Sequence, residues 1–405
     1  MKYRSPQKSS DDDQRITTLD KIRMLRRDEV QIILIIPIAF FIFYIYRSYF
    51  KRKWSENLSA TLTFGSDIVE GGDTVLKEVI SNRKRLGIPF LEVRFQVGKG
   101  LEVENGQNVT VSDRTNITDI FSLRHYEKIT RTLPVHGARR GYYEVLSTSL
   151  VGYDMIGAVE HYALRDQNTS LYVYPMVLPN DRFDVSFSKM LGDVVTRRFL
   201  QEDVFTFRGI RDYTTQDTVS SINWKASAAS AGLKVNLHDP TSSQEIVLLL
   251  NVEDPSVLYD SELLEDSIRL VMSLTTFFIS KHIPVRLISN ARDIISGDEI
   301  EENSGNSDDH RRRIAMDLAR IDLTRDVRPM SEILLDRVIP KARLGSSQSD
   351  VTYMLISSCQ RDDIIRAAGE LADINGSLIW LSPLTPSMEV RVPEGRIQFH
   401  KVKHE

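Results

Sequence analysis

The sequence predicts a multidomain chain with an N-terminal transmembrane helix, an antiparallel β-sandwich, and an α/β domain with a mostly parallel sheet. Three observations support this fold class. Residues 30–46 contain no charge, residues 58–177 contain short segments in which apolar and polar residues alternate, and strand-like and helix-like segments follow one another from about residue 233. Strict alternation predicts strands with one buried face, whereas alternating strands and helices are typical of parallel sheets.

Length and composition limit the class of protein. The chain has 405 residues, which suits two or three domains. It carries 52 basic and 56 acidic residues, a formal net charge of −4, so there is no global positive field of the kind that general nucleic-acid binders use. The single cysteine, Cys359, excludes an intramolecular disulfide and any cysteine-based zinc site.

Residues 1–29 are expected to form a mobile polar arm, and residues 30–50 a transmembrane helix. A helix over residues 30–50 would be about 31 Å long, close to the ~30 Å thickness of a hydrocarbon core. The lipid bilayer is therefore an expected partner, and a single pass through the cell membrane is the expected location. Basic residues are balanced on the two sides of the segment, so the orientation stays open. The alternative is a buried core helix.

Residues 55–200 are predicted as a β-sandwich domain. Glycine-rich and Asn-Gly turn signals separate the alternating segments, and several short strands at close spacing are typical of an antiparallel sandwich. The predicted strands are Leu58–Phe64, Asp73–Ser81, Leu91–Val97, Asn108–Ser112 and Ser170–Val177.

Residues 201–232 are interpreted as a connector, residues 233–390 as the α/β domain and residues 391–405 as a C-terminal tail. An acidic stretch, Ser296–Asp309, is expected to be an exposed loop. The predicted strands of this domain are Leu233–Leu237, at the sheet edge, Glu245–Val252, Pro284–Ser289, Val351–Ser358 and Ser377–Leu384; the predicted helices include Leu263–Ile283 and Arg361–Ile374.

The connector contains the most specific segment of the sequence, FRGIRDYTTQDTVSSINWKASAASAGLKVN, residues 207–236. Asp217 precedes what is predicted to be a short capped helix. In a structural interpretation, which we favour, Trp224 and Tyr213 fill the seam between the two domains and Arg211 pairs with Asp217. In a functional interpretation, another protein binds this same surface.

The connector resembles the signature of the domain of unknown function 58 family. Gln216 departs from the pattern, because the family usually has glycine there. Upstream, Arg140-Gly141-x-Tyr143, Asp154–Gly157 and Val173-Tyr174-Pro175 resemble further family motifs in the same order. The matching connector residues are Gly209, Arg211, Tyr213, Asp217, Ile222, Trp224, Lys225, Ser227, Ala228 and Leu233.

The resemblance implies a membrane-anchored protein with a von Willebrand factor A-like α/β domain and a cytoplasmic location for the folded domains. It also implies an assembly or maturation role beside a MoxR-type AAA+ ATPase. It supplies no catalytic residue and no cofactor. The expected function is therefore that of a non-enzymatic interaction protein, with the ATPase as partner and no nucleic acid.

The alternative is a magnesium-dependent enzyme. Domains of the von Willebrand factor A type often hold Mg²⁺ through D-x-S-x-S at the end of the first strand, because hard cations prefer carboxylate and hydroxyl oxygens. Here Asn251 replaces the first aspartate, and the serines are out of register. Glu253, Asp254 and Ser256 still offer oxygens for a degenerate metal site, which would show as stabilisation by Mg²⁺.

Overall fold

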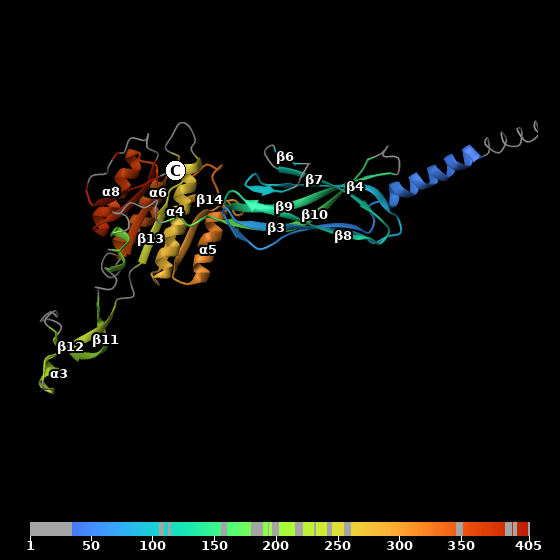
Figure 1. The fold of residues 1–405 in the computed structure, drawn as a ribbon. Helices are drawn as coiled ribbons and strands as arrows, with labels where there is room; N and C mark the ends of the chain where they lie inside the picture. Colours follow the sequence, from blue (N-terminus) through green and yellow to red (C-terminus); the bar gives the residue numbers. More distant parts are fainter. Residues whose placement is uncertain are drawn as a thin grey trace, which may run out of the picture.

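The computed structural model describes residues 35–104, 109–111, 115–154, 160–179, 189–192, 194–196, 202–214, 222–230, 232–240, 245–254, 261–345, 351–384, 391 and 395–403. These residues form a β-sandwich preceded by a helix, a second domain built on a mixed sheet, and a separate β-hairpin (Figure 1). The predicted arm and the first residues of the predicted transmembrane segment, 30–34, lie outside the described residues.

Residues 35–53 are helical, and the end of this helix packs into the sandwich. Phe50 and Trp54 are buried in the sandwich core, whereas Phe40 and Phe41, nearer the start of the helix, are exposed. No helix among the described residues is both long and apolar enough to cross a membrane. On this finding, the predictions of a transmembrane helix and of a single-pass membrane location are wrong.

The β-sandwich consists of two sheets whose inward side chains form one core. Neighbouring strands are antiparallel except for β2 and β10, which are parallel. The prediction of a β-sandwich is confirmed, and the first strand has the predicted bounds. One sheet has the order β1 (Leu58–Phe64), β3 (Asp73–Asn82), β8 (Lys128–Gly137), β5 (Leu101–Val103); the other has the order β2 (Ile68–Val69), β10 (Glu160–Tyr174), β9 (Gly141–Tyr153), β4 (Ile88–Val97), β7 (Thr115–Leu123), β6 (Val109–Val111).

The second domain, here called the mixed-sheet domain, is built on seven strands. Strands β14, β13, β17, β18 and β19 pair in parallel, whereas β15 and β16 pair with β14 in the antiparallel sense. The strands are β13 (Glu245–Leu250), β14 (Val285–Asp293), β15 (Glu299–Gly305), β16 (Ile321–Asp322), β17 (Val351–Ile356), β18 (Leu378–Leu384) and β19 (Ile397–Lys403).

Helices cover both faces of this sheet. Helices α4 (Ser261–Ser280) and α5 (Asp308–Ala319) pack on one face, with Ile246 and Leu248 of β13 in that core. The other face, with Val247 and Leu249, is covered by α6 (Met330–Ile333), the π-helix η3 (Leu334–Val338), α7 (Ile339–Gly345) and α8 (Asp362–Asn375). The apolar run that follows Glu245 in β13 is therefore buried on both sides of the sheet, as its sequence predicts.

The predicted fold class as a whole is wrong. The expected membrane-anchored α/β protein is instead mostly β: strands form more of the described structure than helices do, and the second sheet combines parallel and antiparallel strands. The acidic stretch predicted as a loop contains β15, because backbone pairing with β14 needs no apolar side chains. The predicted C-terminal tail contributes β19 to the sheet.

The predicted edge strand Leu233–Leu237 does not join this sheet. Instead β12 (Lys234–Pro240) pairs antiparallel with β11 (Glu202–Asp212), and a short helix, α3 (Trp224–Ala228), lies between them in sequence. This two-stranded hairpin extends away from the rest of the molecule (Figure 1). The predicted connector is therefore a projecting element within the described structure.

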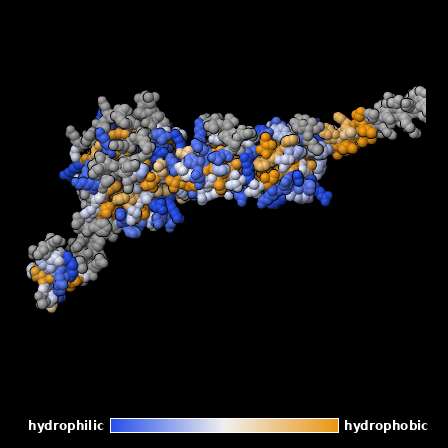
Figure 2. Space-filling view, in the orientation of Figure 1, coloured by the Kyte–Doolittle hydropathy of each residue, from blue (hydrophilic) through white to orange (hydrophobic). Residues whose placement is uncertain are grey.

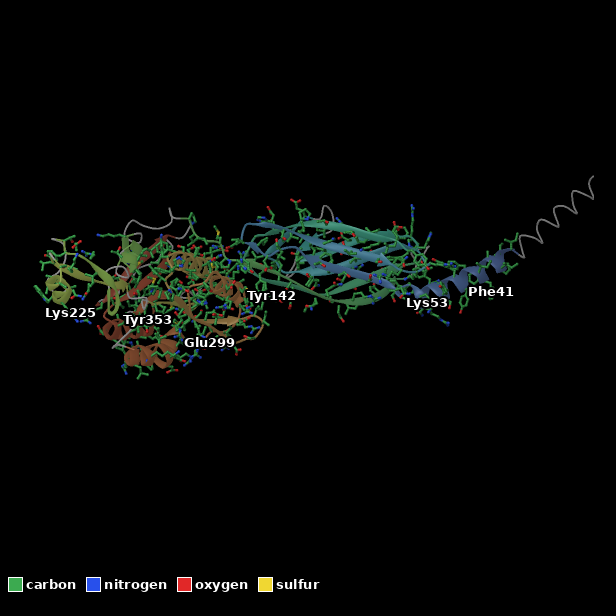
Figure 3. All side chains as sticks on the ribbon, turned by 90° about the horizontal axis from the view of Figure 1, so that it is seen from below. Phe41, Lys53, Tyr142, Lys225, Glu299 and Tyr353 are labelled. Atoms are coloured by element: carbon green, nitrogen blue, oxygen red, sulfur yellow. The ribbon has the colours of Figure 1, made fainter. Side chains whose placement is uncertain are left out.

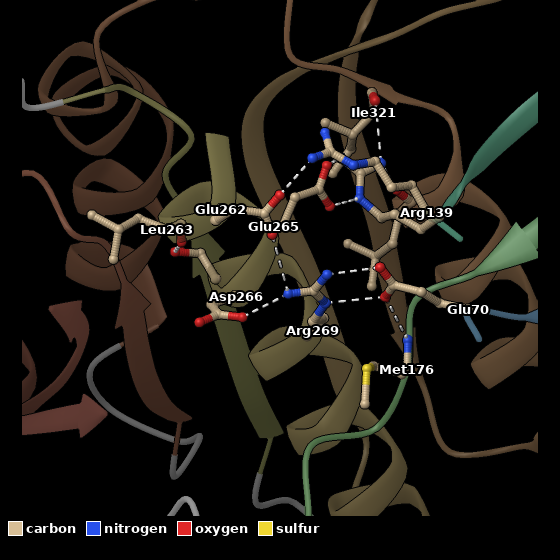
Figure 4. Close-up of polar contacts among 12 residues, drawn as sticks. Glu70, Arg139, Met176, Glu262, Leu263, Glu265, Asp266, Arg269 and Ile321 are labelled. Carbon is tan, nitrogen blue, oxygen red and sulfur yellow. Dashed lines mark hydrogen bonds and ion pairs between the residues drawn. The ribbon is translucent and has the colours of Figure 1, made fainter. Parts of the chain in front are cut away.

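Two arginines, one buried and one partly buried, join the sandwich to the mixed-sheet domain (Figure 4). Arg140, between β8 and β9, donates from Nε and Nη2 to the carboxylate of Glu265 on α4, at 2.6 and 3.2 Å. Its Nη1 donates to the backbone oxygens of Leu318 at 2.9 Å and of Ile321 at 3.2 Å. Burial raises the pKa of Glu265, while the charge of Arg140 acts in the opposite direction.

A second arginine makes the reciprocal contact. Arg269 of α4 donates from Nη2 and Nε to the carboxylate of Glu70 in the sandwich, at 2.7 and 3.0 Å, and from Nη1 to Asp266 at 2.8 Å. The hydrogen bonds to Glu70 raise the pKa of Arg269. Each domain thus supplies one arginine and one carboxylate to what we call the domain joint, Glu70, Arg140, Glu265 and Arg269.

Candidate functional site

The end of the hairpin, here called the tip, comprises residues 209–214, 222–230 and 232–236. Polar side chains attach α3 to β12. The Oδ1 atom of Asn223 accepts a hydrogen bond from the backbone N–H of Ala226 at 2.9 Å, which caps the helix. The Nδ2 atom of Asn223 donates to Oδ1 of Asn236 at 2.7 Å, and Ser227 Oγ accepts from the backbone N–H of Lys234 at 2.8 Å.

The apolar core of the tip is very small. Ile222 forms an isolated bridge with Val235, and these are the two buried apolar side chains among the described tip residues. A two-stranded hairpin without further packing is at best marginally stable in water. The tip therefore relies on its hydrogen bonds, and additional apolar burial would stabilise it.

Trp224 is the first residue of α3, and 64 % of its surface is exposed. Ile210 and Leu233 of the tip are also exposed, at 46 % and 44 %. Figure 2 shows hydrophobic and hydrophilic residues side by side on this small hairpin. The interpretation in which Trp224 fills the seam between the domains is wrong, because the indole faces solvent.

The other predicted connector residues lie in or beside the tip. Gly209 pairs with Leu237 and Arg211 with Val235 across the hairpin, and Arg211 Nη1 donates to the backbone oxygen of Asp212 at 3.0 Å. Figure 3 shows Lys225 at the opposite end of the molecule from Phe41. Asp217, and with it the predicted Arg211–Asp217 pair, lies outside the described residues.

Tyr213 and Ser227 take part in joining the two halves of the tip. The backbone N–H of Tyr213 donates to the carbonyl of Leu233 at 2.9 Å, and the backbone N–H of Lys234 donates to Ser227 Oγ. Sequence reasoning missed Asn223 and Asn236. The signal for Asn223 was present, because an asparagine directly before a helical segment is a typical N-cap.

The predicted metal site lies at the carboxyl ends of the parallel strands. Asn251 follows β13 and is fully buried. Its Nδ2 donates to Ser357 Oγ at 2.9 Å, and its Oδ1 accepts from the backbone N–H of Glu253 at 3.0 Å and from Asn290 Nδ2 at 2.8 Å. An amide at this position supplies both donors and acceptors to three strand ends, which a carboxylate could not do.

The carboxylate of Glu253 is fully engaged within the protein. Its Oε2 accepts from the backbone N–H of Met330, at the start of α6, at 3.0 Å, and its Oε1 accepts from Nη2 of Arg361. Arg361 also approaches Asp363 at 3.3 Å. The guanidinium thus occupies the neighbourhood in which a cation would have to bind.

These residues do not fit a divalent cation. Both Glu253 oxygens have protein donors, Arg361 would repel a second positive charge, and Asn251 carries no charge. Among the described residues, no group of three or more His, Cys, Asp or Glu side chains is arranged to hold a metal ion. Asp254 is half-buried beside this site, and Ser256 lies outside the described residues.

Cys359 follows β17 in the same region and is also structural. It is fully buried, and its backbone N–H and C=O both bond to Ser357 Oγ at 3.1 Å. Burial raises the pKa of its thiol, which keeps the group protonated and weakly nucleophilic at neutral pH. The strand ends therefore form a closed polar network.

Comparison with known proteins gives little further information. No family model and no curated protein match the chain. A non-cellulosomal cohesin from the hyperthermophilic archaeon Archaeoglobus fulgidus is 14 % identical, with 28 % of this chain and 91 % of that chain covered and a TM-score of 0.19. A CARDB domain from Pyrococcus furiosus, crystallised with di-metal ions, is 16 % identical over 28 % of this chain and 94 % of that one, with a TM-score of 0.18.

A protein from Arabidopsis thaliana is 14 % identical over 30 % of this chain and 83 % of that one, with a TM-score of 0.19. These scores are too low to assign an activity, a ligand or a partner. The von Willebrand factor A-like assignment finds no support in these comparisons, and we do not retain it.

Proposed function

We propose that this chain is a non-enzymatic interaction protein that presents the tip to another protein. The observation that carries the proposal is the exposure of Trp224 at the end of a projecting hairpin. Tryptophan is enriched among the residues that dominate binding energy at protein interfaces. Burial of this exposed indole against a partner would also stabilise the marginally stable hairpin that carries it.

The favourable free energy of binding can be estimated from the apolar surface of the tip that a partner would bury. Burying an exposed large apolar side chain contributes about 1.5–3 kcal/mol. Trp224 is accompanied by Ile210 and Leu233, and Lys225 and Arg211 lie among them. A complementary partner would offer an apolar pocket with acidic groups at its rim, because charged groups at the edge of an interface direct association.

We further propose a MoxR-type AAA+ ATPase as the first partner to test. Support for this choice comes from the connector residues that resemble the domain of unknown function 58 signature, most of which lie in the tip. Trp224, Lys225 and Ser227 belong to that signature and to α3 itself. The signature residues would then be partner-binding residues.

The test is binding of the purified full chain to a purified MoxR-type ATPase, measured by titration calorimetry. Trp224→Ala is expected to weaken binding at least tenfold without changing the thermal unfolding midpoint, because the indole packs on little of its own chain. Leu344→Ala is the matched control, since Leu344 of α7 is 86 % exposed but lies outside the tip. Equal binding by Trp224→Ala and the unaltered chain would refute the role of the tip.

A further inference from the structure

The core of the β-sandwich contains an acidic side chain. Glu78 lies in the middle of β3 and faces the other sheet together with Leu76 and Ile80. All three residues are 0 % exposed. A carboxylate placed among apolar side chains loses its hydration, which is costly unless the charge is neutralised or paired.

Two charged groups face Glu78, one from each sheet. Asp119 of β7 belongs to the opposite sheet and is 3 % exposed. Arg131 lies directly opposite Glu78 on the neighbouring strand β8, and its guanidinium crosses to the other sheet to pair with Asp119. These are the charged groups that act on Glu78 within the described structure.

The charges of this cluster balance only when one proton is bound. With both carboxyls ionised, two negative charges face one guanidinium and the core holds a net charge of about −1. One proton on the carboxyl pair makes the cluster neutral and lets one carboxyl donate a hydrogen bond to the other. Burial, followed by the charge and hydrogen bonding of Asp119, raises the pKa of Glu78 to about 8, while Arg131 acts in the opposite direction.

We propose that Glu78 and Asp119 share one proton across the gap between the two sheets, and that this proton makes the β-sandwich a pH-sensitive clasp. Below neutral pH the protonated pair and Arg131 bind the sheets together. As the pH rises, loss of the proton leaves two carboxylates facing each other in the core, and the sheets separate more easily.

The direction of the effect follows from proton linkage. The pKa of Glu78 is about 8 in the folded chain, against an ordinary value of 4.5. The stabilisation is therefore complete below about pH 4.5 and is lost progressively as the pH rises towards 8. This is opposite to the usual behaviour of a salt-bridged carboxylate, whose stabilisation is lost on acidification.

Hydrogen–deuterium exchange of the full chain tests the clasp, because it reads each strand separately. After correction for intrinsic exchange, protection of β3 and β7 is expected to fall about tenfold between pH 6.5 and 8.5, while β13 and β17 stay unchanged. Glu78→Gln keeps a hydrogen-bond donor for Asp119 but cannot titrate, so its protection should stay constant. A Glu78→Gln chain that loses protection in parallel with the unaltered chain would overturn the proposal.

A second measurement covers the case in which Glu78→Gln does not fold. Carbon NMR of the unaltered chain, with carboxyl-labelled glutamate and aspartate, should show one resonance that titrates well above the range of the others. If every glutamate and aspartate carboxyl of the folded chain titrates below pH 7, the carboxyl pair holds no proton at neutral pH and the proposal fails.

Discussion

At the scale of single residues, the strand-end network shows how one arginine removes a potential metal site. Glu253 is 8 % exposed and would be costly to bury as a free anion. Arg361 pairs with it from the position just before α8, and the N–H of Met330 supplies a second donor. The charge that a cation would bring is thus supplied by the chain itself.

Substitution of Arg361 should reveal how much free energy it costs to bury Glu253 without a charged partner. Arg361→Ala is expected to destabilise the mixed-sheet domain by about 1–3 kcal/mol, because Glu253 keeps its burial and loses its charged partner. Chemical denaturation of the full chain measures this loss. On a Glu253→Gln background the same change should cost much less, since no buried charge remains. Equal costs on both backgrounds would contradict the pairing.

Residues of another sequence motif also have a structural explanation. Arg140-Gly141-x-Tyr143 places Arg140 in the domain joint and the Tyr143 ring beside the backbone that precedes it. The Tyr143 hydroxyl donates to the backbone oxygen of Arg139 at 2.9 Å. A Cβ atom at Gly141 would lie 2.8 Å from the ring, and one at Gly100 only 1.8 Å from its hydroxyl. Both glycines are therefore required by the ring.

At the scale of elements, alternation and apolar runs predicted strands well where side chains enter a core. β1 has the predicted bounds, Leu58–Phe64, and β13 begins at the predicted Glu245, because their burial follows the sequence pattern. β15, Glu299–Gly305, was missed because its sequence is polar. It is held by backbone pairing and by ion pairs such as Arg286–Glu301 at 2.6 Å.

The site was predicted only in part. The sequence singled out Trp224 as unusual, yet it does not show whether an apolar side chain finds its partner within the chain or outside it. The seam interpretation failed for that reason. Similarly, the pairing of Glu253 with Arg361 spans 108 residues, and spacing along the chain carries no signal of it.

The cap of α3 provides a test of the tip as an element. Asn223→Ala removes both the cap and the bond to Asn236, so we expect protection from hydrogen exchange in residues 222–230 to be lost. Asn223→Asp keeps the cap acceptor and loses only the donor, so it should retain part of this protection. Capping residues of this kind contribute about 1 kcal/mol, which is large for a five-residue helix.

Ser230→Ala is the matched control for that experiment. Within the part of the chain that the structure describes, the exposed Ser230 hydroxyl donates one hydrogen bond, to the nearby backbone oxygen of Gly232 at 2.9 Å. Its removal should leave the protection of the tip unchanged. If Asn223→Ala and Ser230→Ala behaved alike, the hydrogen bonds of Asn223 would not be what holds α3 on the hairpin.

At the scale of the whole molecule, the domain joint decides whether the sandwich and the mixed-sheet domain move as one body. Arg140 is 6 % exposed and satisfies Glu265 and two backbone carbonyls from the other domain. Arg139, its neighbour, forms an exposed pair with Glu262 at 2.8 Å. Two adjacent arginines thus make ion pairs to the same helix, one buried and one in solvent.

This pair of arginines gives a matched test of the joint. Arg140→Ala leaves a buried carboxylate without its charge partner, which typically costs about 3–5 kcal/mol, whereas loss of an exposed pair in Arg139→Ala should cost less than about 1 kcal/mol. In a Trp224→Phe background, Trp54 in the sandwich and Trp380 in the mixed-sheet domain report unfolding by fluorescence. We expect one transition to separate into two for Arg140→Ala alone. Separation in both variants, or in neither, would mean that the buried arginine does not couple the two domains.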